Sequence, residues 1–91
     1  MAGTRWRRAP DALWRESPDA LIVKAPVSDV EPVAVSGAAA HLWDLLAEPH
    51  TTDELAEALA ELHHADADVV RTDIEPVLAS LCDHHVVERL P

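Results

Sequence analysis

Residues 31–46 read Glu31-Pro-Val-Ala-Val-Ser-Gly-Ala-Ala-Ala-His-Leu-Trp-Asp-Leu-Leu46, and they pass from strand-forming to helix-forming sequence. Val33–Val35 has the β-branched character of a strand. After it, apolar residues recur at the spacing of one helix face, and Ser36 is placed to cap the first free N–H groups. The apolar residues of that face are Leu42, Trp43, Leu45 and Leu46. The stretch therefore predicts a strand that leads directly into a helix over about residues 37–47.

The residues before this stretch predict further short strands. Ala20–Ala25 is an apolar run with β-branched residues, bounded by Ser17-Pro-Asp on one side and by Pro26 on the other. A shorter run, Ala12–Arg15, precedes it. Residues 1–8 are expected to form either a flexible tail or an extended lead-in that Trp6 anchors. The N-terminal part is thus expected to form an antiparallel sheet of up to three strands, with Val33–Val35 as the last.

From Ser36 onward the apolar period becomes helical. The first helix is expected to stop at Glu48-Pro49, because the residue before a proline disfavours helical backbone angles. A capping box, Thr51-Thr-Asp-Glu54, marks the start of the second helix. Its inward face is expected to carry Leu55, Leu59 and Leu62, and its outward face Glu57 and Glu61.

A third helix is predicted over about residues 67–83, after Asp66. Its apolar stripe consists of Val70, Ile74, Val77, Leu78 and Leu81. Pro76 lies inside it, where a proline removes one hydrogen bond and costs about 3 kcal/mol, so we expect a kink or a late helix start. Residues 84–90 are expected to form a short extended tail. The whole chain, 1–91, is predicted to be one α+β domain with a winged helix-turn-helix-like order in which the strands come first.

Charge is distributed unevenly along the chain. Residues 1–24 hold five of the seven basic residues against three acids, whereas residues 25–91 hold two against fourteen. Nucleic-acid binders gain most of their non-specific affinity from Lys and Arg on phosphates, so the acidic helices argue against that class. The chain has a single cysteine and no apolar run long enough for a membrane span or a signal peptide, so a cytoplasmic protein without disulfides is expected.

The six histidines and Cys82 do not predict a metal or catalytic site. His63-His64 and His84-His85 are adjacent pairs, and neighbouring side chains of a helix point in different directions. Zinc needs three or four converging ligands, and a nucleophile needs a base in triad geometry. Cys82 is instead expected to be a small, half-buried hydrophobic residue. No cofactor, no metal and no catalytic residue is therefore predicted.

An ordered set of runs resembles the PqqD-like family, whose members recognise the leaders of ribosomally made, post-translationally modified peptides. The runs are Trp6-Arg-Arg-Ala-Pro, Leu21-Ile-Val, Val35-Ser-Gly, Leu42-Trp-Asp-Leu-Leu, Thr52-Asp-Glu-Leu-Ala-Glu-Ala-Leu, and Val70 to Leu81 with Asp73. The resemblance covers about residues 6–88. It implies three strands and three helices, with the leader bound as an added antiparallel strand on strand three and packed against helix three.

Carried onto this chain, the resemblance implies two groups of peptide-binding residues. They are Val30, Glu31, Pro32, Val33, Ala34 and Val35 for the strand, and Val70, Asp73, Ile74, Val77, Leu78 and Leu81 for the helix. A free-standing module of this size is most similar to the recognition proteins of lasso peptide pathways, whose partner is a separate leader peptidase, with a cyclase as a further partner. The chain departs from the family at Pro76 and at Asp83-His-His-Val86, where relatives often have a glycine.

The strand at the edge of a small sheet exposes unpaired N–H and C=O groups, which are either protected or used for pairing. This physical argument supports peptide binding at the predicted third strand independently of the resemblance. The same apolar residues could instead be core. Glu31 and Asp73 could favour a leader with Lys or Arg, and the arginines at positions 5, 7 and 8 could dock an acidic enzyme or be solvated. The alternative functions are a winged-helix nucleic-acid binder, a peptide chaperone in a radical-SAM-modified pathway, and a small hydrolase or metal protein.

Overall fold

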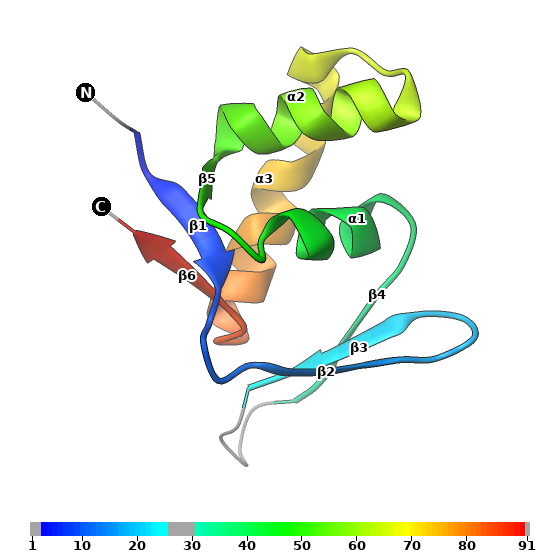
Figure 1. The fold of residues 1–91 in the computed structure, drawn as a ribbon, viewed down its shortest axis with the longest axis vertical. Helices are drawn as coiled ribbons and strands as arrows, with labels where there is room; N and C mark the ends of the chain where they lie inside the picture. Colours follow the sequence, from blue (N-terminus) through cyan, green and yellow to red (C-terminus); the bar gives the residue numbers. More distant parts are fainter. Residues whose placement is uncertain (1–2, 26–30, 91) are drawn as a thin grey trace.

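The computed structural model describes residues 3–25 and 31–90 of the chain, so Val30, one of the predicted site residues, lies outside the described residues. The strands are β1 (Arg5–Arg8), β2 (Leu13–Glu16), β3 (Leu21–Lys24), β4 (Val33–Val35), β5 (His50–Thr51) and β6 (Val87–Leu90). The helices are α1 (Ala38–Leu45), α2 (Thr52–His63) and α3 (Ala67–Asp83). The predicted α+β class with an N-terminal sheet of three antiparallel strands and three helices is confirmed (Figure 1).

The predicted sheet has the order β2-β3-β4, with both pairs antiparallel. A tight turn at Ser17–Ala20 joins β2 to β3, closed by a 2.9 Å hydrogen bond from the Ser17 N–H to the Ala20 carbonyl. One face of this sheet is covered, because Leu21, Val23 and Val35 are buried. Figure 1 shows α1 above that sheet, on the same side as the other two helices.

A second sheet of three strands, in the order β5-β1-β6, was not predicted. Its central strand is β1, which pairs with β6 from Arg5↔Leu90 to Arg8↔Val87. Of the two alternatives for the N-terminal residues, the extended lead-in anchored by Trp6 is therefore the one found at Arg5–Arg8. Trp6 is 9% exposed, and its indole N–H donates to the Thr52 hydroxyl at 3.0 Å.

The start of α1 differs from the prediction that Ser36 caps it. Gly37 is the N-cap residue, with φ 59°, and no side chain caps the helix. Ser36 contributes its backbone carbonyl, which accepts from the Ala39 N–H at 3.2 Å. Gly37 takes this role because a left-handed backbone angle is nearly free of cost for glycine and not for serine.

The two longer helices begin where their polar caps predict. Thr51 and Glu54 form the complete capping box of α2, and Asp66 accepts from two N–H groups at the start of α3. The carboxylate of Glu54 accepts from the Thr51 N–H at 2.8 Å, and this bond lowers the pKa of Glu54 below its usual value. Pro76 lies inside a helix that begins at Ala67, so the expectation that this helix starts late is wrong.

The core lies between the three helices and the buried faces of the two sheets. Leu55 and Leu59 are buried as predicted, but Leu62 is 57% exposed, so its inward assignment is wrong. Leu62 occupies the last turn of α2 before His64, where the chain reverses into α3. Apolar spacing predicts the face of a helix, but it does not show how far the neighbouring helix covers that face.

An arginine between two tryptophans connects the two sheets. The Arg8 guanidinium lies 4.7 Å from the Trp14 ring centroid and 4.8 Å from that of Trp43, and its Nε donates to the Trp43 carbonyl at 2.9 Å. The two rings meet edge to face with centroids 5.8 Å apart. Burial lowers the pKa of Arg8, and the nearby Asp44 carboxylate partly offsets this. This stack fixes the β2–β3 hairpin to α1.

Candidate functional site

β4 is an edge strand of its sheet, and the hydrogen-bond alternation shows which of its residues faces the open side. Ser17 and Ala20 form a hydrogen-bonded pair at the turn. Residues of a central strand point their N–H and C=O groups alternately to the two neighbours. Ile22 therefore bonds to β2, as Ala20 does, whereas Leu21 and Val23 bond to β4.

The register carries this alternation across to β4. Val35 lies opposite Leu21, and Val33 lies opposite Val23, so the backbone N–H and C=O groups of both valines bond to β3. Ala34 lies opposite Ile22, and its N–H and C=O point away from β3. Within the described residues, β4 pairs only with β3. Ala34 is thus the one residue of β4 whose backbone groups are directed at the open edge.

A groove of about 420 Å³ lies along this edge, between β4 and α3. It is lined by Val33, Ala34, Val35, Ser36, Ala39, Pro76, Val77, Ser80 and Leu81. None of these side chains is ionisable, so the groove offers apolar surface and two hydroxyl groups. An extended peptide with alternating apolar residues matches that chemistry, because its backbone can pair with a strand while every second side chain enters the groove.

The predicted site residues divide between this groove and the core. Val33, Ala34, Val35, Val77 and Leu81 line the groove. Ile74 and Leu78 are 5% and 0% exposed and do not line it, so the structure places them in the core. Leu81 has both roles, since it is 1% exposed and lies at the groove floor.

Four other predicted residues do not line the groove. Glu31 and Pro32 are exposed and precede β4, so Pro32 is not inside the strand. On α3, Val70 is half-buried and packs against the core, while Asp73 is exposed. Asp73 lies one helical turn before Val77, close enough in sequence for its carboxylate to lie near the end of the groove.

Sequence reasoning missed four lining residues, and they share a small or stubby side chain. These are Ser36, Ala39, Pro76 and Ser80. Pro76 and Ser80 are four residues apart on α3, so they lie on one face of the helix. The sequence feature that could have identified them is a short stripe of small residues beside the stripe of large apolar residues. Close approach of a second backbone requires such small side chains.

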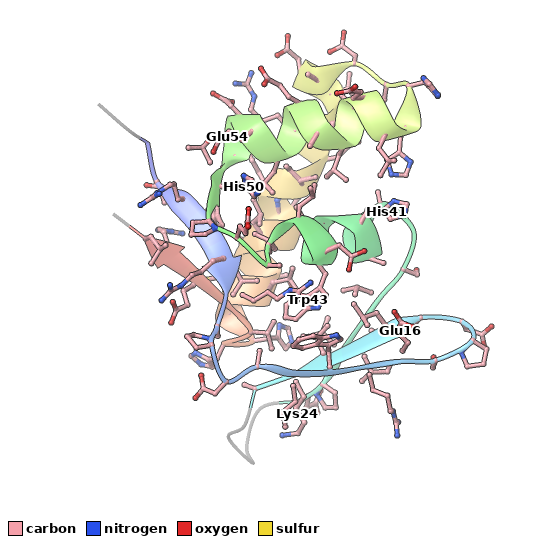
Figure 2. The ribbon with its side chains drawn as sticks, in the orientation of Figure 1. Glu16, Lys24, His41, Trp43, His50 and Glu54 are labelled. Carbon is pink, nitrogen blue, oxygen red and sulfur yellow. The ribbon has the colours of Figure 1, made fainter. Side chains whose placement is uncertain are left out.

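A second hollow of about 290 Å³ continues past the Ser36 end of the groove. The two hollows share Val35 and Ser36, and this one is also lined by the carboxylates of Glu16, Asp19 and Asp44. In Figure 2, Glu16 lies at the hairpin end of the sheet, and Trp43 lies between α1 and the sheet. The apolar groove therefore has an acidic end.

No group of three or more His, Cys, Asp or Glu side chains that could hold a metal occurs in residues 3–25 and 31–90. The fold does join two distant histidines, with His41 Nδ1 at 2.9 Å from His63 Nε2. Cys82 is half-buried and packs against the core, as expected of a small hydrophobic residue. In the same described ranges, no helix is long and apolar enough to cross a membrane.

Comparison with known protein families gives a match over most of the chain. The family described as "Coenzyme PQQ synthesis protein D (PqqD)" matches residues 28–87, which include β4, all three helices and the first residue of β6. No curated protein and no solved structure matches the chain.

Proposed function

Because the chain belongs to the PqqD family, we propose that it captures the leader of a precursor peptide at the open edge of β4. Proteins of this family are non-catalytic peptide-binding partners of the enzymes that modify ribosomally made peptides.

The observation that carries the proposal is the combination of a free backbone edge at Ala34 with an apolar groove beside it. The leader adds as an antiparallel strand, and its backbone bonds to the N–H and C=O of Ala34. Alternate side chains of the leader enter the groove and contact Val33, Val77 and Leu81. Backbone pairing supplies affinity without sequence preference, and the groove supplies selectivity for apolar residues at every second position.

Charge near the groove adds a preference for basic residues that flank the apolar ones. Glu31 lies just before β4, and Asp73 lies on α3 one turn before Val77. A Lys or Arg of the leader near either carboxylate gains a modest, salt-sensitive attraction, as exposed ion pairs do.

The receiving enzyme is proposed to be the leader peptidase of a lasso peptide pathway, and a cyclase acts on the same complex. The chain does no chemistry itself; it raises the local concentration of the substrate at the enzyme. Isolated protein is accordingly expected to leave a precursor peptide intact. Cleavage by the purified chain that disappears in Cys82→Ala would contradict this adaptor role.

Titration of ¹⁵N-labelled protein with candidate leader peptides tests the binding mode. The largest amide shifts are expected at β4 and along the groove face of α3. Ala34→Pro removes the N–H aimed at the guest, while the bonds from β4 to β3 stay in place. Its matched control is Ala34→Thr, which keeps the N–H and adds a side chain at an exposed position.

The two variants separate loss of pairing from loss of structure. Ala34→Pro is expected to melt near the wild-type temperature and to lose most leader affinity, whereas Ala34→Thr binds normally. A folded Ala34→Pro variant with wild-type affinity would show that the leader does not use this edge.

A further inference from the structure

The outer face of the β2-β3-β4 sheet has an unusual composition for this protein. The buried residues Leu21, Val23 and Val35 define the inner face, so the alternate residues of each strand point outward. Register and alternation place Leu13, Arg15, Ile22, Lys24 and Ala34 on that outer face. All five are apolar or basic, although the chain has 17 acidic residues and 7 basic ones.

Such a face is not what solvent exposure alone selects. When one face of an antiparallel sheet packs on the core, the other is usually polar. Here Leu13 is 60% exposed, the highest value among the exposed large apolar side chains of the described chain. A shallow hollow of about 270 Å³ lies on this face, lined by Leu13, Trp14, Arg15, Ile22, Lys24 and Pro32. Figure 2 shows Lys24 on the side of the sheet away from α1.

Two of the three arginines at positions 5, 7 and 8 are engaged within the fold. Arg7 donates to the Glu88 carboxylate at 2.7 Å, and Arg8 lies between Trp14 and Trp43. The docking role that the sequence left open for arginines 7 and 8 is therefore better served by Arg15. No hydrogen bond or ion pair is found for its exposed guanidinium within the described residues.

We infer that this outer sheet face is a docking surface for an acidic protein surface with an apolar projection, carried by the enzyme that acts on the bound peptide. The identity of that partner as the pathway enzyme rests on the proposed function. Leu13, Ile22 and Pro32 receive the apolar projection, and Arg15 faces the carboxylates around it. Charge complementarity selects the partner and speeds its association, while burial of apolar surface in the hollow stabilises the complex.

The docking surface and the peptide edge can be occupied together. Ala34 directs its backbone groups along the sheet to the open edge, whereas its side chain lies on the outer face. A guest strand extends the sheet sideways, so it leaves the outer face of β2 and β3 uncovered. The enzyme can therefore approach the leader from the face next to the edge.

The test uses the chain of residues 1–91, its leader peptide and the purified modifying or processing enzyme of the same pathway. Leu13→Ser and Arg15→Glu are combined to remove the apolar contact and reverse the charge. Leu62→Ser is the matched control for the first change, because Leu62 is 57% exposed on α2. Arg5→Glu is the control for the second, since it makes the same charge change on the exposed Arg5 of β1.

The Leu13→Ser/Arg15→Glu variant is expected to bind the enzyme at least about tenfold more weakly, with leader affinity and melting temperature unchanged. The Leu62→Ser and Arg5→Glu controls keep enzyme affinity. Raised salt should weaken the wild-type complex more than the variant complex.

Several results would overturn the inference. Unchanged enzyme affinity in the variant would do so, as would a wild-type chain that binds its leader but not the enzyme. Light scattering that shows a dimer lost in the variant would assign the face to a second copy of the chain. Binding of wild-type protein, but not the variant, to vesicles of phosphatidylglycerol would assign it to a lipid surface. Failure of the wild-type chain to bind any leader would instead refute the proposed function.

Discussion

Val77 tests the peptide groove with less risk to the fold than Leu81, the other large apolar residue that α3 contributes to the groove. It is half-buried on α3, lines the groove and packs against the edge of the core. Val69, eight residues earlier on the same helix, is 57% exposed and does not line the groove. Val77→Asp and Val69→Asp therefore make the same chemical change at a groove position and at a solvated one.

The expected loss of leader-binding free energy in Val77→Asp has two parts. Full burial of a valine side chain contributes about 1.5 to 3 kcal/mol, so a half-buried Val77 gains about 1 kcal/mol from contact with a guest. Covering a polar group without a partner costs about 1 to 3 kcal/mol more. A total of about 2 to 4 kcal/mol corresponds to about a 30- to 700-fold increase in the Kd for the leader.

Isothermal titration with the leader peptide measures this difference, and circular dichroism checks the fold of each variant. Val69→Asp should bind within about twofold of wild type, because no guest covers that position. If Val77→Asp unfolds, Val77→Ala supplies the test with an expected loss of about 1 kcal/mol. The groove assignment is refuted if Val77→Asp binds normally, or if both aspartate variants lose affinity equally.

Three further predictions concern the fold that holds the groove. Val35→Pro removes the N–H that pairs with Leu21 and is expected to destabilise the domain by about 1 to 3 kcal/mol, seen as a lower urea midpoint; a stable variant would contradict the derived alternation. Glu54 has a lowered pKa in the folded protein, so its stabilising contribution is present at neutral pH and is lost as the pH falls through the folded pKa. Wild type should therefore lose more stability on acidification than Glu54→Gln, and equal losses would exclude this role of the capping box. His85 has φ 60° at the end of α3, so His85→Gly should raise the melting temperature by up to about 8 °C, and a lower value would show that the imidazole makes a stabilising contact.

Local chemistry explains which parts of the fold the sequence predicts. The start of α2 follows from Thr51 and Glu54, which bond to each other within one turn, and the start of α3 follows from Asp66. These signals need no knowledge of the rest of the chain. The β5-β1-β6 sheet has no such signal, since Arg5 pairs with Leu90 and its strands are rich in charged residues.

The candidate site shows the same division. The β-branched run Val33–Val35 predicts the edge strand, and the apolar stripe predicts which face of α3 turns inward. The stripe does not separate Ile74 and Leu78, which are core, from Val77, which lines the groove. That separation depends on where β4 crosses α3, and this crossing is a tertiary property that periodicity along one helix does not contain.

The β2–β3 hairpin carries part of the proposed docking surface, and one stack of side chains holds it to the rest of the domain. Arg8 stacks on Trp14 and Trp43, so β2 is fixed to α1 and the body of the domain. Loss of that stack, as in Arg8→Ala, would free β2 without removing any residue from the groove or from the outer face. If the enzyme binds the outer sheet face only when β2 is held rigidly, Arg8→Ala should weaken enzyme binding more than leader binding, because β4 keeps its pairing with β3. Equal loss of both affinities would mean that the sheet and the groove depend on the stack together, and the two surfaces could not then be independent.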